Sequence, residues 1–367
     1  MQSFDLRIGG TWGALHPAAL TRINSGNFAS RQKASDLHPE TEMGLTAVKV
    51  DCGGRPLLRS SAKPPPAATP LRAKPMSVER SESIITRDRA GHDYRSLLVH
   101  VEPGLVASHR VELAAGLARR FHARLIGLGA EALKPVISAD AFSGQLVVEV
   151  YQQLQNQVEI ELKAAETAFL RDAAGGDIEW RIEHADPSQA MARAARAADL
   201  IVTTADEARS GDVFTRLEVG EIVLISGRPV LVGPAGHGHL AGEKILVAWK
   251  DTREARRAVA DAMPFLVRAQ GVLVHGVCTP DEVETTRVAV DDVAKALRRH
   301  GVAATAKVST APNDRKVAAE LNASAAAFGA DLIVAGAYGH SRMMERVLGG
   351  VTRSLLTDPE RYLLLSH

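Results

Sequence analysis

The chain has 367 residues, 46% of them hydrophobic, which is enough material for two ordinary hydrophobic cores. Its 44 Lys and Arg side chains nearly balance its 43 Asp and Glu side chains, so the net charge gives no reason to expect nucleic acid or a membrane as partner. Two cysteines, Cys52 and Cys278, are too few for a disulfide framework, and no signal peptide is recognised, so we expect a cytoplasmic protein.

Residues 1–92 are predicted to form a disordered or non-native N-terminal extension. Six prolines lie between Pro56 and Pro75, and residues 1–90 carry 13 basic against 8 acidic side chains. Such a segment has too few apolar side chains to offset the conformational entropy that it would lose on ordering. Because Met76 follows the proline-rich run, we hypothesise that the natural protein starts there and that residues 1–75 are not part of it.

Beyond this extension, short apolar runs alternate with longer helical patterns, which is typical of an α/β domain with a parallel sheet. The continuous apolar runs 96–101 and 244–249 predict strands that are covered on both faces. Residues 143–171 predict one extended helix, because their apolar residues recur at helical spacing over the whole segment.

The same order of elements occurs twice. Residues 198–202 and residues 330–334 share the sequence ADLIV at an offset of 132. The same offset places residues 229–232 on residues 361–364. We therefore predict two tandem doubly wound units, each with a parallel sheet of about five strands flanked by helices. The boundaries that follow are a first domain at 93–235, a Gly-rich linker at 236–242 and a second domain at 243–367.

A glycine-rich stretch follows the predicted strand that ends near Val334. Gly336, Gly339 and Gly349 have the spacing G-x2-G-x9-G, and a helical pattern begins after Gly349. Glycine allows backbone N–H groups to approach an anion closely, and helix N-terminal amides favour the same anion. The spacing predicts a phosphate-binding loop, with a strand-end turn and close helix packing as the structural alternative.

This stretch, ADLIVAGAYGHSRMMERVLGGVTRSLL, and the tandem arrangement resemble the universal stress protein family. The resemblance covers residues 94–367, more strongly in the second unit. It implies an adenine nucleotide alpha-hydrolase-like fold, pairing of units through their last strands, and an ATP site at the carboxyl ends of the strands. The pairing would occur within the chain or between two chains of a homodimer, and Mg²⁺ would accompany ATP.

The resemblance also implies site residues. Gly336, Gly339 and Gly349 match the phosphate loop of the family, whereas Gly350 stands where the family has Ser or Thr. Thr352 matches a second hydroxyl position. Members that bind ATP carry an Asp directly after the first strand, but here Lys250 takes that position and Asp251 lies one residue later.

Two polar residues complete the predicted nucleotide site. His340 and Arg342 lie one and three residues after the second glycine of the loop, where Arg342 or His340 would complement a γ-phosphate; the polarity of an exposed loop is the alternative explanation. In the first unit the loop glycines correspond to Thr204, Glu207 and Leu217, so that unit is predicted to be degenerate. At most one nucleotide site per chain follows.

We therefore predict a regulatory stress-response module that binds an adenine nucleotide, with ATP as the expected cofactor, no catalytic residues and no resident metal site. The spacing does not distinguish ATP from AMP or a cyclic nucleotide. One alternative is the same fold without nucleotide, acting through contacts with unknown protein partners, which Gly350 and Lys250 favour. The other is a slow ATPase or autophosphorylating protein, for which Asp251 is the acidic residue that could serve.

Overall fold

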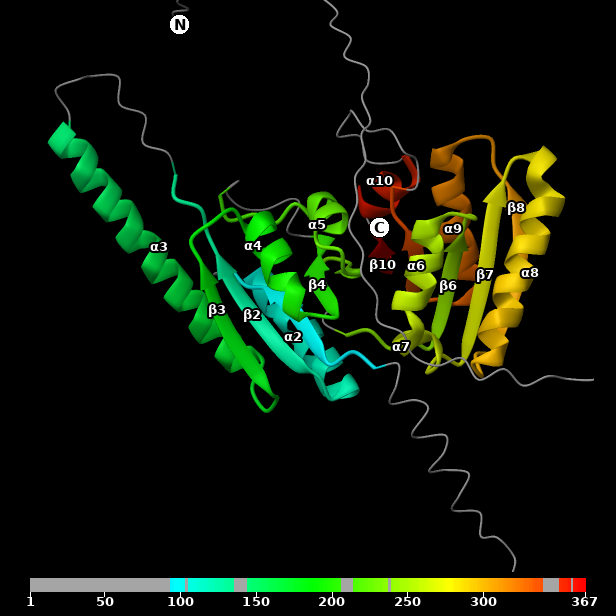
Figure 1. The fold of residues 1–367 in the computed structure, drawn as a ribbon, viewed down its shortest axis with the longest axis horizontal. Coiled ribbons are helices and arrows are strands. Elements are labelled where there is room, and N and C mark those ends of the chain that lie inside the picture. The colour runs from blue at the N-terminus through cyan, green and yellow to red at the C-terminus, as the bar shows by residue number, and fades with distance from the viewer. Residues whose placement is uncertain are drawn as a thin grey trace, which may run out of the picture. The chain divides into compact units, whose positions relative to one another are not determined.

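The computed structural model describes residues 93–102, 105–134, 144–205, 214–236, 239–338, 350–357 and 359–367. Residues 1–92, where the sequence predicts an extension, lie outside the described residues, so that expectation stays a prediction. The described residues form a sheet with helices on both of its faces (Figure 1).

The first five strands alternate with helices along the chain. In order, the elements are β1 (Ser96–His100), α2 (Leu105–Phe121), β2 (Arg124–Ala130), α3 (Gly144–Asp172), β3 (Ile178–Glu183), α4 (Pro187–Ala194), a short 3-10 helix (Ala195–Ala197), β4 (Leu200–Thr204), α5 (Val219–Ile225) and β5 (Val230–Gly233). Helix α3 confirms the extended helix predicted for residues 143–171.

A second series of elements follows after residue 243. It consists of β6 (Lys244–Trp249), α6 (Arg253–Asp261), α7 (Met263–Leu266), β7 (Gly271–Cys278), a 3-10 helix (Pro280–Glu282), α8 (Val283–Arg299), β8 (Ala304–Thr310), α9 (Asp314–Phe328), β9 (Leu332–Gly336), α10 (Gly350–Thr357) and β10 (Tyr362–Ser366). The strand predicted at residues 244–249 is confirmed as β6.

The ten strands are hydrogen-bonded in the order β3-β2-β1-β4-β5-β10-β9-β6-β7-β8. Every neighbouring pair is parallel except β5 and β10, which run antiparallel with Leu363 opposite Val232 and Leu365 opposite Val230. Read outward from this antiparallel pair, both sides have the same order of strands. The mostly parallel sheet flanked by helices confirms the predicted α/β class.

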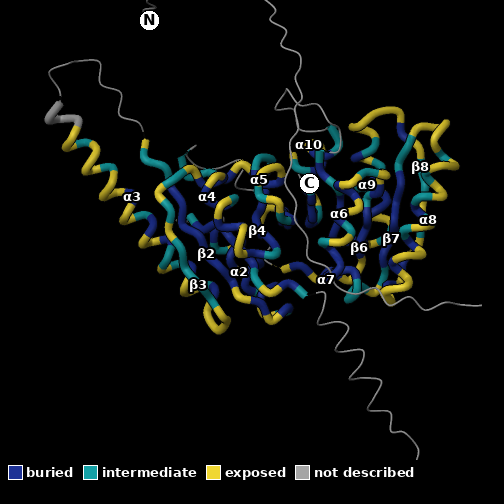
Figure 2. Tube along the Cα trace, in the orientation of Figure 1, coloured by how far each residue is buried: buried dark blue, intermediate teal, exposed yellow. Residues whose placement is uncertain are grey.

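Successive residues of each strand alternate between two cores, one on each face of the sheet. Leu97 and Val99 of β1 belong to one core, whereas Leu98 between them belongs to the other. Helices α2, α3, α6 and α8 contribute to the first core, and α4, α5, α9 and α10 to the second. The central strands are accordingly buried along their length (Figure 2). Burial on both faces explains why these strands are continuous apolar runs.

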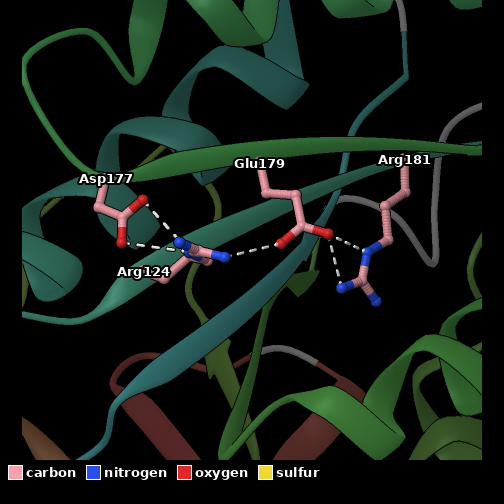
Figure 3. A network of polar contacts seen from close by, with 4 residues as sticks. All are labelled: Arg124, Asp177, Glu179 and Arg181. Carbon is pink, nitrogen blue, oxygen red and sulfur yellow. Dashed lines mark hydrogen bonds and ion pairs between the residues drawn. The ribbon is translucent and has the colours of Figure 1, made fainter.

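Strand β3 lies at one end of the sheet and is joined to β2 by a network of ion pairs (Figure 3). Arg124 Nε lies 3.1 Å from Asp177 Oδ2, and Arg124 Nη1 lies 3.4 Å from Glu179 Oε2. Glu179 also accepts a 2.7 Å hydrogen bond from Arg181. These pairs are partly solvent-exposed and contribute little stability, but charges along an edge strand discourage pairing with another chain.

A polar cluster interrupts the second core between β7, β8 and α9. His275 is fully buried, and its Nε2 lies 2.7 Å from the Ser309 hydroxyl. On the same face, Lys307 donates to Ser324 at 2.7 Å and lies 3.3 Å from the Glu320 carboxylate. Burial, assisted by the positive charge of Lys307, lowers the pKa of His275 to about 4. The folded protein therefore holds this imidazole neutral at physiological pH.

The depressed pKa of His275 predicts a loss of stability in acid. Below the unfolded-state pKa of about 6.5 the unfolded chain binds a proton that the folded chain does not take up until about pH 4. The free energy of unfolding should therefore fall by about 3 kcal/mol from this group between pH 7 and pH 4. Urea unfolding between pH 7 and pH 4 should show that the free energy of unfolding of His275→Gln depends less on pH than that of the wild type.

His109→Gln is the matched control, because His109 is half-exposed on α2. The control should keep the pH dependence of the wild type. If His275→Gln kept the wild-type pH dependence as well, burial of a neutral imidazole at position 275 would not be the cause of the loss of stability in acid.

Candidate functional site

Among the described residues, two of the predicted site residues, Gly336 and Asp251, lie near the point where the strand connections change direction. From β6 the chain proceeds through β7 to β8, and then crosses back to β9 on the other side of β6. Gly336 is the last residue of β9, and Lys250, Asp251 and Thr252 connect β6 to α6. Ligands of open α/β sheets bind at such a switch point, outside the carboxyl ends of the strands. The structure therefore places Gly336 and the β6–α6 turn at the ends of neighbouring strands.

Gly336 has a packing reason to be glycine. A Cβ at this position would lie 2.5 Å from the backbone nitrogen of Ala255 and 2.6 Å from the carbonyl carbon of Glu254. Real Cβ atoms do not approach backbone this closely, so any side chain would push α6 away from β9. For Gly336 the structural alternative to phosphate binding was a strand-end turn, and the structure adds a close approach of α6 to the end of β9.

The first turn of α6 is fixed by capping and by a buried carboxylate. The Thr252 hydroxyl accepts a hydrogen bond from the amide of Ala255 at 3.3 Å. Glu254 is only 4% exposed and pairs with Arg253. Burial acts to raise the pKa of Glu254, but hydrogen bonds from Arg253, its own amide and Thr252 outweigh it and leave that pKa below its ordinary value. A charged carboxylate, which the sequence did not single out, therefore belongs to the helical turn whose backbone packs against Gly336.

Asp251 is placed at the surface of the same turn. Its carboxylate lies 2.5 Å from Arg256 Nη2, and the side chain is 62% exposed. The ion pair directs this carboxylate toward α6. Asp251 is thus near the switch point but already has a cationic partner.

Gly350 and Thr352 lie on α10, which packs on α9 in the second core. A Cβ on Gly350 would lie 2.6 Å from Asp314 Oδ2, where Asp314 is the first residue of α9. Thr352 is 7% exposed. Because β10 runs parallel to β9, the chain must return between them, and α10 begins on the carboxyl side of the sheet. The start of α10 therefore lies on the carboxyl side of the sheet, which is the side where the sequence predicts the phosphate loop.

Four predicted site residues are Gly339, His340, Arg342 and Gly349, and all of them lie outside the described residues. The convergence of the three loop glycines on one anion therefore stays a prediction.

Two buried polar atoms flank the switch point without a partner among the described residues. They are Nε1 of Trp249, the last residue of β6, and Oη of Tyr338, two residues beyond β9. Tyr338 adopts a left-handed φ of 61°, which is strained for a residue with a side chain, and burial raises its pKa to about 12. A buried donor without an acceptor costs about 1–3 kcal/mol. No local sequence pattern indicates either atom, because an aromatic residue near the end of a strand is equally suited to the core.

A buried arginine lies at the carboxyl ends of β1 and β4, which correspond in the strand order to those of β6 and β9. Arg110 of α2 is fully buried, donates to the His100 carbonyl at 2.9 Å, and lies 3.4 Å from both the Glu102 carboxylate and the Thr204 hydroxyl. Its guanidinium therefore ties the ends of β1 and β4 together. Glu207, which the sequence aligned with a loop glycine, lies outside the described residues.

Among the described residues, no group of three or more His, Cys, Asp or Glu side chains is arranged to hold a metal ion. No helix within the described part of the chain has the length and apolarity to span a bilayer.

Comparison with known proteins gives matches among solved structures only. No protein-family model matches the chain, and neither does any curated protein. A universal stress protein from Archaeoglobus fulgidus DSM 4304 is 14% identical with a TM-score of 0.53, and the match covers 74% of this chain and 97% of that one. This likeness in three dimensions decides the fold. The chain has the universal stress protein fold.

Two further matches have lower TM-scores. A putative universal stress protein from Pseudomonas aeruginosa UCBPP-PA14 is 17% identical with a TM-score of 0.46, and the match covers 76% of this chain and 94% of that one. A universal stress protein solved in complex with cAMP is 21% identical with a TM-score of 0.24, covering 38% of this chain and 96% of that one.

In this universal stress protein fold, the close approach of α6 to β9 predicts that Gly336 is indispensable for packing. Gly336→Ala should lower the free energy of unfolding by about 2–3 kcal/mol, because the new Cβ meets backbone rather than a movable side chain. Urea unfolding of the full chain measures this loss.

Gly116→Ala is the matched control. Nothing lies within 4 Å of a Cβ at Gly116, which is inside helix α2, so the substitution should stabilise by about 1 kcal/mol through helix propensity. Equal effects of the two substitutions would show that the space around Gly336 is not limiting.

Proposed function

We propose that the chain is a cytoplasmic stress-response protein that binds one molecule of ATP at the carboxyl edge of β6 and β9. The observation that carries the proposal is the meeting of the β6–α6 turn with the end of β9 at the switch point of the sheet. The unpartnered polar atoms of Trp249 and Tyr338 at the same strand ends support a ligand there. The protein acts as a regulatory binding module rather than as an enzyme.

The proposed residue roles follow the order of the loop. Backbone amides at Gly339, Gly349 and Gly350 surround the phosphates, and the buried Thr352 lies in the following helical turn. His340 and Arg342 complement the γ-phosphate. Gly336 acts by letting α6 approach β9, and Mg²⁺ enters with ATP.

Asp251 takes the adenine or ribose contact in this proposal, although its carboxylate is paired with Arg256. Because both side chains of that pair are largely exposed, the carboxylate can exchange the partner at little cost.

We further propose that the chain comprises two domains, 93–235 and 243–367, joined by a linker at 236–242 and paired within the chain. The antiparallel ladder between β5 and β10 supports this pairing. So does an aromatic cluster in which Phe121 packs edge-on against Tyr94 and Phe265, with ring centroids 5.1 and 5.2 Å apart. Association of two chains would use other surfaces, because this ladder occupies both final strands.

We propose one ATP per chain because the carboxyl ends of the strands in the first domain are occupied by a protein side chain. The buried guanidinium of Arg110 already holds the ends of β1 and β4 in that domain. A nucleotide phosphate there would have to displace Glu102 from an almost fully buried ion pair, which is costly.

The second candidate function is the same fold acting through protein contacts without nucleotide. The pairing of Asp251 with Arg256 favours it, because it occupies the carboxylate that would contact adenine or ribose. The carboxylate of Asp314 beside Gly350 favours it as well, because it repels a phosphate.

Titration calorimetry of the full chain with Mg·ATP tests the proposal. We expect saturable binding near one ATP per chain, and a loss of at least about tenfold in affinity for Gly339→Val, because a side chain there blocks the amide cradle. Substitutions of Gly336 are unsuitable as probes, since they disturb packing as well as binding.

Gly176→Val is the control, because a Cβ at Gly176 meets nothing closer than 3.9 Å and the position is far along the sheet from β9. Absence of heat at millimolar Mg·ATP would contradict nucleotide binding and favour the protein-contact function. Equal affinity of the Gly339 variant and the wild type would place the nucleotide elsewhere.

A further inference from the structure

The amino ends of β2 and β3 border a cavity that the proposed function does not use. Its volume is about 290 Å³, and it is lined by the last turn of α2, the turn after α3 and the first residues of the two strands. The candidate nucleotide site lies instead at the carboxyl ends of β6 and β9. The cavity is therefore a separate feature, and it belongs entirely to the first five strands and their helices.

The interior of the cavity is apolar and lined by small side chains. Leu125 and Ile178 lie opposite each other in the β2–β3 ladder, and both line the cavity. On the helix side it is lined by Ala115, Ala118 and Ala173, which are only 1–6% exposed. A space with apolar walls and a few polar groups is the usual form of a site for a small molecule.

A glycine keeps this space open without any packing reason. A Cβ on Gly176 would meet nothing closer than 3.9 Å, and the nearest atoms, the Ala173 carbonyl oxygen and Ile178 Cγ2, both belong to lining residues. The neighbouring Gly175 has a φ of 88° and needs to be glycine for its conformation, whereas Gly176 does not have a left-handed φ. A larger side chain at position 176 would thus enter the cavity.

The rim of the cavity carries a positive charge that is not neutralised. Among the described residues, the side chain of Arg119 has no hydrogen-bond or ion-pair partner. Asp177 is the acidic residue of the lining, and its carboxylate is held by Arg124 at 3.1 Å (Figure 3). The cavity therefore combines an apolar interior with a guanidinium that is available to an anion.

A histidine at the same rim adopts a strained backbone conformation. His122 has a φ of 52°, which favours glycine. Its amide donates to the Arg119 carbonyl at 3.3 Å, and the amide of Ala123 donates to the Ala118 carbonyl at 2.9 Å, so His122 ends α2 in a Schellman motif. Residues with side chains in such strained conformations cluster at functional sites. The imidazole is a second polar group at the rim.

We propose that this cavity binds a small carboxylic acid with an apolar body. The apolar body covers Leu125 and Ile178, and the carboxylate pairs with Arg119 and accepts a hydrogen bond from His122. A cavity of about 150 Å³ holds benzene, so 290 Å³ accommodates a ring together with a short acidic chain. The inference is independent of the proposed nucleotide site, because the two sites share no residue.

Ligand-observed NMR titrations of the full chain with 3-phenylpropionate and with its neutral amide test the inference. The acid should bind saturably with a Kd on the order of 0.1–1 mM, and the amide about five- to tenfold more weakly. Arg119→Gln removes the charge, so it should weaken binding of the acid about five- to tenfold and leave the affinity for the amide unchanged. Gly176→Leu should abolish binding of both, because its side chain occupies the cavity.

Arg196→Gln is the matched control for net charge. Arg196 is an exposed arginine of the 3-10 helix after α4, and that helix contributes to the second core, whereas the cavity lies on the face of the first core. This variant should bind both compounds like the wild type. Thermal unfolding of the three variants verifies that they are folded.

The outcomes separate this inference from its alternatives. Loss of acid binding in Gly176→Leu, together with selective weakening of the acid in Arg119→Gln, supports it. Absence of saturable binding of the acid to the wild type at millimolar concentrations overturns it. Equal affinity of the acid for the wild type and either variant also overturns it, because the acid then binds elsewhere or without Arg119. Gly176→Leu should bind Mg·ATP like the wild type, so a failure to bind ATP concerns the proposed function alone.

Discussion

The structure depends on burial of the parallel strands on both faces. Leu97, Leu98 and Val99 are successive residues of β1 and all are completely buried, because helices cover both faces of the sheet. A strand enclosed in this way keeps its side chains, including an occasional polar one such as His275, out of reach of a ligand along its length. Polar groups that interact with a ligand must therefore lie at the strand ends, and the sequence after each strand determines what each end can do.

Much of this architecture could be predicted from the sequence. The apolar runs of β1 and β6, the extended helix α3 and the α/β class all follow from local periodicity, which is strong because burial on both faces leaves few alternatives. The position of the candidate site also follows, since the end of β9 is marked by Gly336. What local patterns could not supply was the reason for each glycine. Gly336 accommodates the backbone of α6, and Gly350 accommodates Asp314, and both neighbours are distant in the sequence.

Other features were beyond sequence reasoning for the same physical reason. Glu254 and Arg110 read as ordinary charged positions on amphipathic helices, yet the structure buries both at strand ends. A charged side chain can be buried only when partners meet it, and those partners come from other elements, such as the His100 carbonyl at the end of β1. Burial of a charge is thus a property of the assembled sheet, and no local pattern reveals it.

The carboxyl ends of β1 and β4 and those of β6 and β9 therefore carry different chemistry on the same scaffold. At the β1–β4 edge, Arg110 provides a cation that is enclosed and already bonded to Glu102 and two oxygen atoms of the strand ends. At the equivalent position of α6, 148 residues later, stands the buried methyl group of Ala258, which makes no polar contact with the strands. Loss of the internal guanidinium leaves the β6–β9 edge without a buried cation of its own among the described residues, and the polar atoms of Trp249 and Tyr338 there have no described partner. Arg110 thus satisfies the strand ends of β1 and β4 from within the fold, whereas the polar atoms of Trp249 and Tyr338 at the ends of β6 and β9 are the groups to which the proposed ligand would bind.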